Sequence, residues 1–303
     1  MISISYFYLE NVKIQKIVSQ DTYYLLKKNT NQEKILKQLK LKNINIEYFK
    51  WRITSFIRDD HFVPKAGEYL IKKNFTIQDI QDIFQNEKTI VRSFKLIEGA
   101  TSDNLRKRLL ENPYLSGKMK FLKEGIYKPD TYYFKYGYSR NKLLERMKLA
   151  QDKMLDNVWK YKPKNFILKN KEELLILASI IQKEARDWND SRLVASVFIN
   201  RLEKNMKLQS DVTLAYGYNI NGQKITKKML ISDNPFNTYF HKGLPPTPIS
   251  YPGEKALKSL KFVEKTDFYY FVSDGRGGHR FSKTYSTHKK NIELWKNSST
   301  KDQ

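Results

Sequence analysis

One carboxylate of this 303-residue chain lies in an apolar setting where it could act as a general acid. Glu184 follows the run Leu174–Ile181, in which apolar residues recur at helical spacing. Burial disfavours the charged form of a carboxyl group and raises its pKa, which suits proton donation near neutral pH. The structural alternative is a surface carboxylate that pairs with Lys183 or Arg186. This segment alone leaves both interpretations open.

A second helix is predicted directly after Glu184. Asn189, Asp190 and Ser191 are residue types that cap helix N-termini, and apolar residues line one face of Arg192–Leu202. The two segments therefore predict an αα-hairpin with Glu184 near its open end.

The sequence argues against metal, nucleotide and thiol chemistry. Neither His279 nor His288 has an acidic or histidine partner at ligand spacing, so we expect no metal. The glycine-rich turn Asp274–His279 lacks the helix start and the Lys-Ser/Thr pair of a phosphate loop, which argues against a nucleotide. Cysteine is absent, which excludes disulfides and thiolate catalysis. We therefore expect no cofactor.

The formal net charge of +24 fits an anionic partner. Nucleic acid, the bacterial cell wall and anionic lipid headgroups are all compatible with it, as is a genome that favours lysine codons. The lysines are spread along the chain rather than clustered with arginine and aromatic residues on one face, so no nucleic acid is expected.

The first third of the chain repeats one local pattern. Runs that begin at Tyr24, Tyr69 and Phe94 each read as a short strand, a turn, a polar capping residue and an amphipathic helix. The predicted caps are Thr30 or Asn31, Thr76, and Thr101 or Ser102. A further helix is predicted over Asn45–Ile57. Such a strand–helix–helix–strand module resembles the glycan-binding LysM fold, and a docking domain without sugar contacts is the alternative.

Seven segments together resemble the YceG-like family of endolytic murein transglycosylases. In the family's order they are Glu124–Phe134, Ala178–Glu184, Val194–Leu202, Met206–Asp211, Phe236–Tyr239, Gly243–Gly253 and Tyr270–Phe281. The resemblance extends from about Tyr69 to the C-terminus. Gln182 stands where the family usually has glutamate, which points to Glu184 as the residue that carries the chemistry.

The resemblance implies lytic transglycosylation of peptidoglycan. Glu184 would protonate the glycosidic oxygen that leaves the anomeric carbon of N-acetylmuramic acid. As a carboxylate it would then take the proton of that sugar's 6-hydroxyl, which closes onto the anomeric carbon as a 1,6-anhydro ring. An intramolecular hydroxyl has a high effective concentration, so the second carboxylate of ordinary glycosidases is not needed. The expected role is to limit the length of nascent glycan strands.

Further motif residues are expected to bind the substrate. They are Gln209, Ser210, Asp211, Asn237, Thr238, Tyr239 and His279. Amides and hydroxyls among them would stabilise the oxocarbenium-like state around the acetamido group. The alternative is a non-catalytic scaffold protein that binds the cell wall, and the retained Glu184 favours the enzyme.

The resemblance also implies a place of action and partners. The family usually begins with one membrane-spanning helix, whereas the apolar start Ile2–Leu9 is too short to span about 30 Å of hydrocarbon and is no convincing signal peptide. We nevertheless expect the periplasmic face of the cell inner membrane, because murein lies outside it. The expected partners are glycan strands, the cell-wall synthesis machinery and the cytoplasmic membrane.

The predicted fold class is α+β. A small LysM-like α/β module is expected over residues 1–90, a linking α+β region over residues 91–170, and a mixed, lysozyme-like catalytic domain over residues 171–303.

Overall fold

The computed structural model describes residues 14–57, 62–220 and 224–299, and it divides the chain into two compact units. Unit 1 comprises the chain up to Phe94 with Tyr114–Ser116 and Tyr133–Tyr138, and unit 2 comprises the remainder. Both contain helices and short strands, so the predicted α+β class is confirmed. The three-domain division remains a prediction, and the apolar start Ile2–Leu9 lies outside the described residues.

The core of unit 1, as far as the described residues show, is built from an antiparallel strand pair and helices. Strand β1 (Thr22–Leu26) pairs with β2 (Gly67–Ile71), so that Tyr24 lies opposite Tyr69. The helices are α2 (Gln32–Lys40), α3 (Tyr48–Ile57) and α4 (Ile77–Gln85). Alternate strand residues are buried with the apolar helix faces, and Trp51 and Phe84 are completely enclosed in the resulting core.

The predicted caps fall where the sequence placed them. Asn31, Thr76 and Thr101 accept hydrogen bonds from the backbone N–H of the third helical residue of α2, α4 and α5 (Ser102–Glu111), respectively. Thr76 and Thr101 each form a full capping box, in which the third residue's side chain binds back to the cap. These local bonds fix the start of each helix.

Two further short strand pairs, formed largely by unit 1 residues, come before the long helix of unit 2 in the chain. Strand β3 (Val91–Lys95) pairs with β5 (Thr131–Lys135), and β4 (Leu115–Ser116) pairs with β6 (Tyr138–Ser139). Helix α6 (Arg140–Lys160) follows with Ser139 as its cap.

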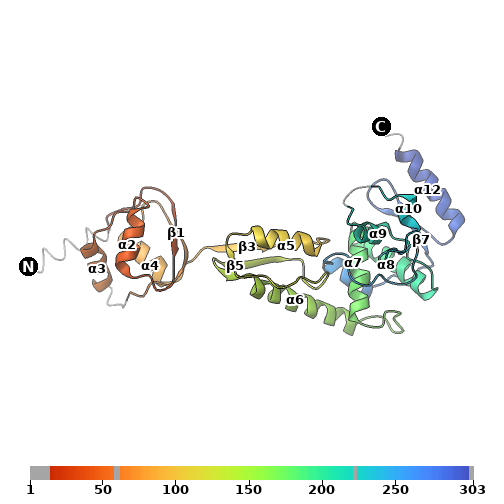
Figure 1. The fold of residues 1–303 in the computed structure, drawn as a ribbon, viewed down its shortest axis with the longest axis horizontal. Helices are drawn as coiled ribbons and strands as arrows, with labels where there is room; N and C mark the ends of the chain where they lie inside the picture. Colours follow the sequence, from red (N-terminus) through yellow and green to blue (C-terminus); the bar gives the residue numbers. More distant parts are fainter. Residues whose placement is uncertain (1–13, 58–61, 221–223, 300–303) are drawn as a thin grey trace, which may run out of the picture. The chain divides into compact units, whose positions relative to one another are not determined.

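Helix α7 (Lys171–Glu184) is the centre of unit 2. The sequence predicted one apolar stripe on this helix, but all eight residues from Leu174 to Ile181 are buried. Helices α6, α8 (Trp188–Glu203), α9 (Asp211–Gly217) and α11 (Glu254–Lys261) all contact it. A helix enclosed on every side has no polar face. Figure 1 shows α7 beside α8 and α9.

Helix α8 begins earlier than predicted. The sequence placed the cap at Asn189–Ser191, whereas Asp187 is the cap and accepts a hydrogen bond from the Asp190 backbone N–H at 3.0 Å. An aspartate three residues earlier is an equally good acceptor, so composition did not distinguish the two registers. Because Asp187 caps the helix, the side chain of Asp190 is available for contacts with other residues.

The last described segment consists of a hairpin and a helix. Strands β7 (Tyr270–Ser273) and β8 (His279–Ser282) pair antiparallel across the predicted turn, and α12 (Tyr285–Ser299) follows. The short helix α10 (Lys227–Leu230) precedes the Phe236–Tyr239 loop. Among the described residues, no helix combines the length and the apolar character that crossing a membrane requires.

Candidate active site

Glu184 is the last residue of α7, where the buried part of the helix reaches the protein surface. Its side chain is partly buried and partly exposed, so a ligand can reach it. Ala185 follows with an extended backbone and ends the helix. The apolar core therefore holds the carboxyl group at a fixed point on the rim of unit 2.

Burial raises the pKa of the Glu184 carboxyl group above its ordinary value. A hydrogen bond from Ser210 and the charge of His279 act in the opposite direction, whereas the negative charges of Asp211 and Asp190 raise the pKa further. The net shift favours the protonated form, which is the form that a general acid requires at neutral pH.

Ser210 binds Glu184 directly and is itself clamped. Its Oγ donates to Glu184 Oε1 at 2.5 Å. Its backbone N–H donates to Thr238 Oγ1 at 3.0 Å, and its carbonyl accepts from Thr213 Oγ1 at 2.8 Å. The two threonine hydroxyls lie 2.9 Å apart. Because Ser210, Thr213 and Thr238 are all buried, this network fixes the serine in one orientation.

Ser210→Ala should shift the pH dependence of activity. The lost hydrogen bond lowers the pKa of Glu184, so its removal raises that pKa, and the acid form persists to higher pH. We expect the alkaline limb of a kcat/KM profile to move upward in pH, with a lower rate at the optimum. Ser286→Ala, which changes an exposed serine, is the control. An alkaline limb that stays in place would show that the bond does not tune Glu184.

The backbone before Ser210 is held in an unusual conformation. Gln209 has a φ of 50°, in the left-handed region that residues other than glycine, asparagine and aspartate rarely adopt. Its N–H donates to the Thr238 carbonyl at 3.0 Å, and its side-chain oxygen lies 3.5 Å from Arg201 Nη1. The strained backbone of Gln209 thus places its side chain beside buried Arg201 and directs the side chain of Ser210 to Glu184.

Arg201 is a buried cation that the sequence reasoning did not select. It is 7% exposed and donates to the carbonyls of Leu208, Lys207 and Tyr269. Burial lowers its pKa. Arg201 lies on the apolar face of α8, seven residues after Val194 and three after Phe198. A charged residue at a position where the helical pattern predicts an apolar one is the sequence signal that could have identified it.

Asn237 and Thr238 support the site from within the protein. Asn237 is completely buried, and its amide donates to the carbonyls of Met229, Leu230 and Ser232, while its oxygen accepts from the Tyr239 N–H. The Thr238 hydroxyl is engaged with the Ser210 backbone N–H and the Thr213 hydroxyl. Both side chains are therefore buried and hold neighbouring loops in place, and their part in substrate binding remains a prediction.

Asp211 and Tyr239 form the open side of the site. The Tyr239 hydroxyl donates to Asp211 Oδ1 at 2.6 Å, and Asp211 is exposed at the start of α9. Burial and this carboxylate raise the pKa of Tyr239, so it remains a protonated donor. The negative charge of Asp211 raises the pKa of Glu184, and the charges of Asp211 and Glu184 both raise the pKa of Tyr239, as expected of neighbouring groups.

His279 and Asp190 form a pair beside Glu184. His279 Nδ1 lies 2.9 and 3.0 Å from the two Asp190 oxygens, and the side chains are 13% and 7% exposed. Burial by itself lowers the pKa of His279, but the hydrogen bond and charge of Asp190, with the charges of Glu184 and Asp274, outweigh it and leave the pKa raised. The Asp190 carboxylate beside Nδ1 keeps a proton on that nitrogen and leaves Nε2 available for other contacts.

His279→Gln should remove a pH-dependent part of the stability. The folded-state pKa of His279 is raised, so protonation stabilises the fold fully below the unfolded value of about 6.5. This contribution is lost as the pH rises through the folded value. The free energy of unfolding of the wild type relative to the variant should therefore fall over that interval. Denaturant titrations at a series of pH values measure it, and a constant difference would contradict the pairing.

The turn between β7 and β8 contacts the residues after Glu184. Arg186 Nη1 donates to the Arg276 carbonyl at 2.6 Å. Gly277 has a φ of +89°, and a Cβ there would lie 2.3 Å from Arg186 Nη1. The positive φ favours glycine at this point of the turn, and a side chain there would also displace the Arg186 guanidinium from the Arg276 carbonyl.

The structure thus gathers motifs that are far apart in the chain. Ser210, Asp211, Tyr239 and His279 surround Glu184. Asn237 and Thr238 are buried in the surrounding loops, whereas Gln209 is exposed and its side-chain oxygen lies beside Arg201. Sequence reasoning missed Arg201 and treated Asp190 only as a cap.

A sequence model of the YceG-like family matches residues 19–294, and the chain belongs to this family. The resemblance found in the sequence is confirmed.

Two curated relatives are named endolytic murein transglycosylase. The Bacillus subtilis protein is 38% identical over 135 residues, which cover 44% of this chain and 38% of that protein. The Streptococcus pneumoniae D39 protein is 28% identical over 282 residues, which cover 89% of this chain and 49% of that protein. The chain thus spans about half, or less, of the length of these relatives.

A solved structure has a similar fold. The crystal structure of a yceG-like protein from Listeria monocytogenes has a TM-score of 0.57 and 27% identity, and the match covers 89% of this chain and 98% of that one.

Proposed function

We propose that this chain is a lytic transglycosylase that cleaves peptidoglycan glycan strands and leaves 1,6-anhydro ends on N-acetylmuramic acid. The observation that carries the proposal is the state of Glu184. Its pKa is raised by burial, it is accessible, and it is oriented by Ser210. The names of the relatives support the choice of substrate.

In the proposed reaction Glu184 acts twice. The hydrogen bond from Ser210 occupies Oε1, so the proton to be transferred sits on Oε2. Glu184 gives this proton to the glycosidic oxygen as the bond to the anomeric carbon breaks. The resulting carboxylate takes the proton of the 6-hydroxyl, whose oxygen bonds to the anomeric carbon. No atom is gained or lost, and Glu184 returns to its acid form.

The neighbouring carboxylates support this single-acid reaction. Asp211 accepts the Tyr239 hydroxyl and Asp190 holds His279, so each is already engaged with a side chain. In inverting glycosidases a second carboxylate is free to activate water. An intramolecular hydroxyl replaces that water here, and its high effective concentration accounts for a site with one acting acid.

Digestion of purified murein tests the proposal. The full chain should release or shorten glycan strands, and mass spectrometry should find anhydro-muramic ends. Binding to murein without any cleavage would overturn the enzyme assignment and favour the scaffold alternative.

The finer expectations form part of the same proposal. We propose that unit 1 acts as a LysM-like glycan-binding module and that the catalytic part of unit 2 is lysozyme-like. Support comes from a cavity of about 470 Å³ beside β1 in unit 1, where Tyr23 and Leu41 are 59% and 81% exposed. Cleavage would limit nascent strand length. The site of action would be the periplasmic face of the inner membrane, where the +24 charge favours anionic headgroups.

A further inference from the structure

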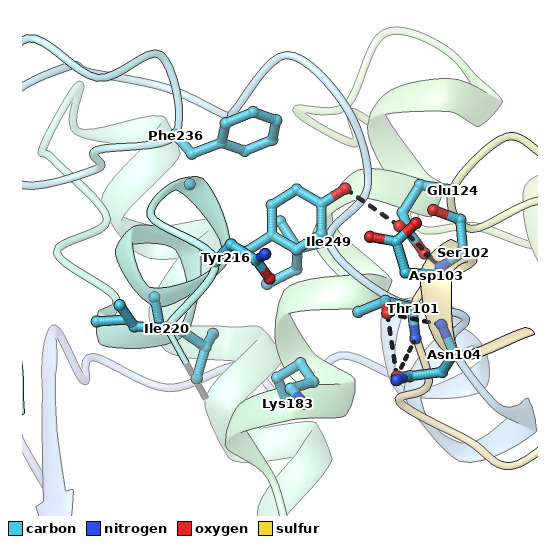
Figure 2. A pocket seen from close by; sticks show the side chains of 14 residues that line it. Thr101, Ser102, Asp103, Asn104, Glu124, Lys183, Tyr216, Ile220, Phe236 and Ile249 are labelled. Atoms are coloured by element: carbon cyan, nitrogen blue, oxygen red, sulfur yellow. Dashed lines mark hydrogen bonds between the residues drawn. The ribbon is translucent and has the colours of Figure 1, made fainter. Parts of the chain in front are cut away.

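A cavity of about 780 Å³ in unit 2 has no part in the chemistry at Glu184. Figure 2 shows its two sides. One is polar and comes from the start of α5 and from Glu124. The other is apolar and presents the rings of Tyr216 and Phe236, whose centroids are 5.0 Å apart, with Ile220 nearby.

Glu124 and Tyr216 meet inside this cavity. The Tyr216 hydroxyl donates to Glu124 Oε2 at 3.1 Å, and the Ser102 N–H donates to both carboxylate oxygens at 2.9 and 3.1 Å. Burial raises the pKa of Glu124 despite these bonds. The side chain is only partly buried, so its remaining acceptor capacity is open to a ligand.

The lining favours a neutral, polyhydroxylated ligand over a cation. Asp103 and Glu124 supply acceptors, but Lys183 lies on the same cavity and offsets part of their charge. The capping box uses Asn104 Oδ1, which leaves its NH₂ group as a donor. A sugar ring has hydroxyls on its edge and C–H groups on its faces, so it suits a cavity with one polar and one aromatic side.

The cavity lies close to the acid. Lys183 immediately precedes Glu184 in α7. Helix α9 carries Asp211, which acts on Glu184, and Tyr216 five residues later, a rise of about 7.5 Å. A second cavity of about 870 Å³ shares Ser102, Glu124 and Tyr216 with the first. The Glu124–Tyr216 contact is therefore a wall common to two adjacent cavities.

We propose that these two cavities are successive subsites for sugar units beyond the bond that Glu184 cleaves. This inference rests on the proposed function and names the part of the substrate bound there, the glycan backbone. A chain of subsites on one side of the acid holds a long strand by its interior, as an enzyme that cleaves within strands requires.

Calorimetric binding of glycan strands, peptide-free and peptide-bearing in parallel, tests the inference. Glu184→Gln in the full chain serves as the parent, so that strands stay uncleaved. Glu124→Gln or Phe236→Ala added to it should each weaken binding of long strands about tenfold. Asp103→Asn changes an exposed residue of the same side and should weaken binding in the same direction. Tyr161→Phe, at an exposed tyrosine outside the cavities, should stay within about twofold of the parent.

Three outcomes separate the possibilities. A deficit that fades as the strands are shortened supports subsites remote from the cleaved bond. Equal affinities for all variants, with melting temperatures that show intact folding, would overturn the inference. A deficit seen only with peptide-bearing strands would overturn it in favour of a stem-peptide site. Because binding is read without turnover, absence of cleavage by the wild type would count against the proposed function and leave this measurement intact.

Discussion

Glu184→Gln should reduce glycan cleavage by at least about a thousandfold while the fold persists. The amide has nearly the same shape and can still accept the hydrogen bond of Ser210, but it has no acidic proton to give. Because Glu184 serves as acid and then as base in the proposed reaction, both proton transfers are lost together. Murein digestion and thermal melting of the same samples measure the effect.

Glu203→Gln is the matched control for this variant. Glu203 is an exposed glutamate on the neighbouring helix α8, and its replacement should leave the rate near that of the wild type. A Glu184→Gln protein that cleaves murein within tenfold of the wild type would remove Glu184 from the chemistry.

Arg201→Ala should destabilise unit 2 by about 3 kcal/mol and lower its melting temperature by roughly 6–12 °C. The arginine donates to the Leu208 carbonyl at 2.7 Å and to the Tyr269 carbonyl at 2.6 Å in a buried setting. Truncation leaves these acceptors unpaired and opens a void. Because Leu208 and Gln209 lead directly to Ser210, activity should fall as well. Calorimetry measures the melting transition.

Arg280→Ala is the control for the arginine substitution. Arg280 is exposed on β8, so its loss should change stability by less than about 0.5 kcal/mol. Equal melting temperatures for the two variants would show that Arg201 does not hold the Leu208–Ser210 segment.

Local features of this fold could be predicted because their causes are local. The caps Asn31, Thr76 and Thr101 act on amides three residues away, so a short window of sequence contains the whole interaction. The hairpin around Asp274–His279 is similarly determined by its glycines. The helix that ends in Glu184 was visible from its periodicity, although not its burial on every side.

The remaining features depend on contacts between distant residues. His279 contacts Asp190, which lies 89 positions earlier in the sequence, and Tyr216 contacts Glu124, which lies 92 positions earlier. No spacing rule links such pairs, and a residue that could cap a helix could equally hold a histidine. The left-handed backbone of Gln209 is likewise set by its bond to Thr238 rather than by its residue type.

Digestion of murein in oxygen-18 water tests the central claim most directly. The claim is that the sugar's own 6-hydroxyl, and not water, replaces the glycosidic oxygen after Glu184 donates its proton. New muramic ends should therefore carry no label and should have the mass of a 1,6-anhydro sugar. Reducing ends that contain oxygen-18 would show hydrolysis and contradict the account.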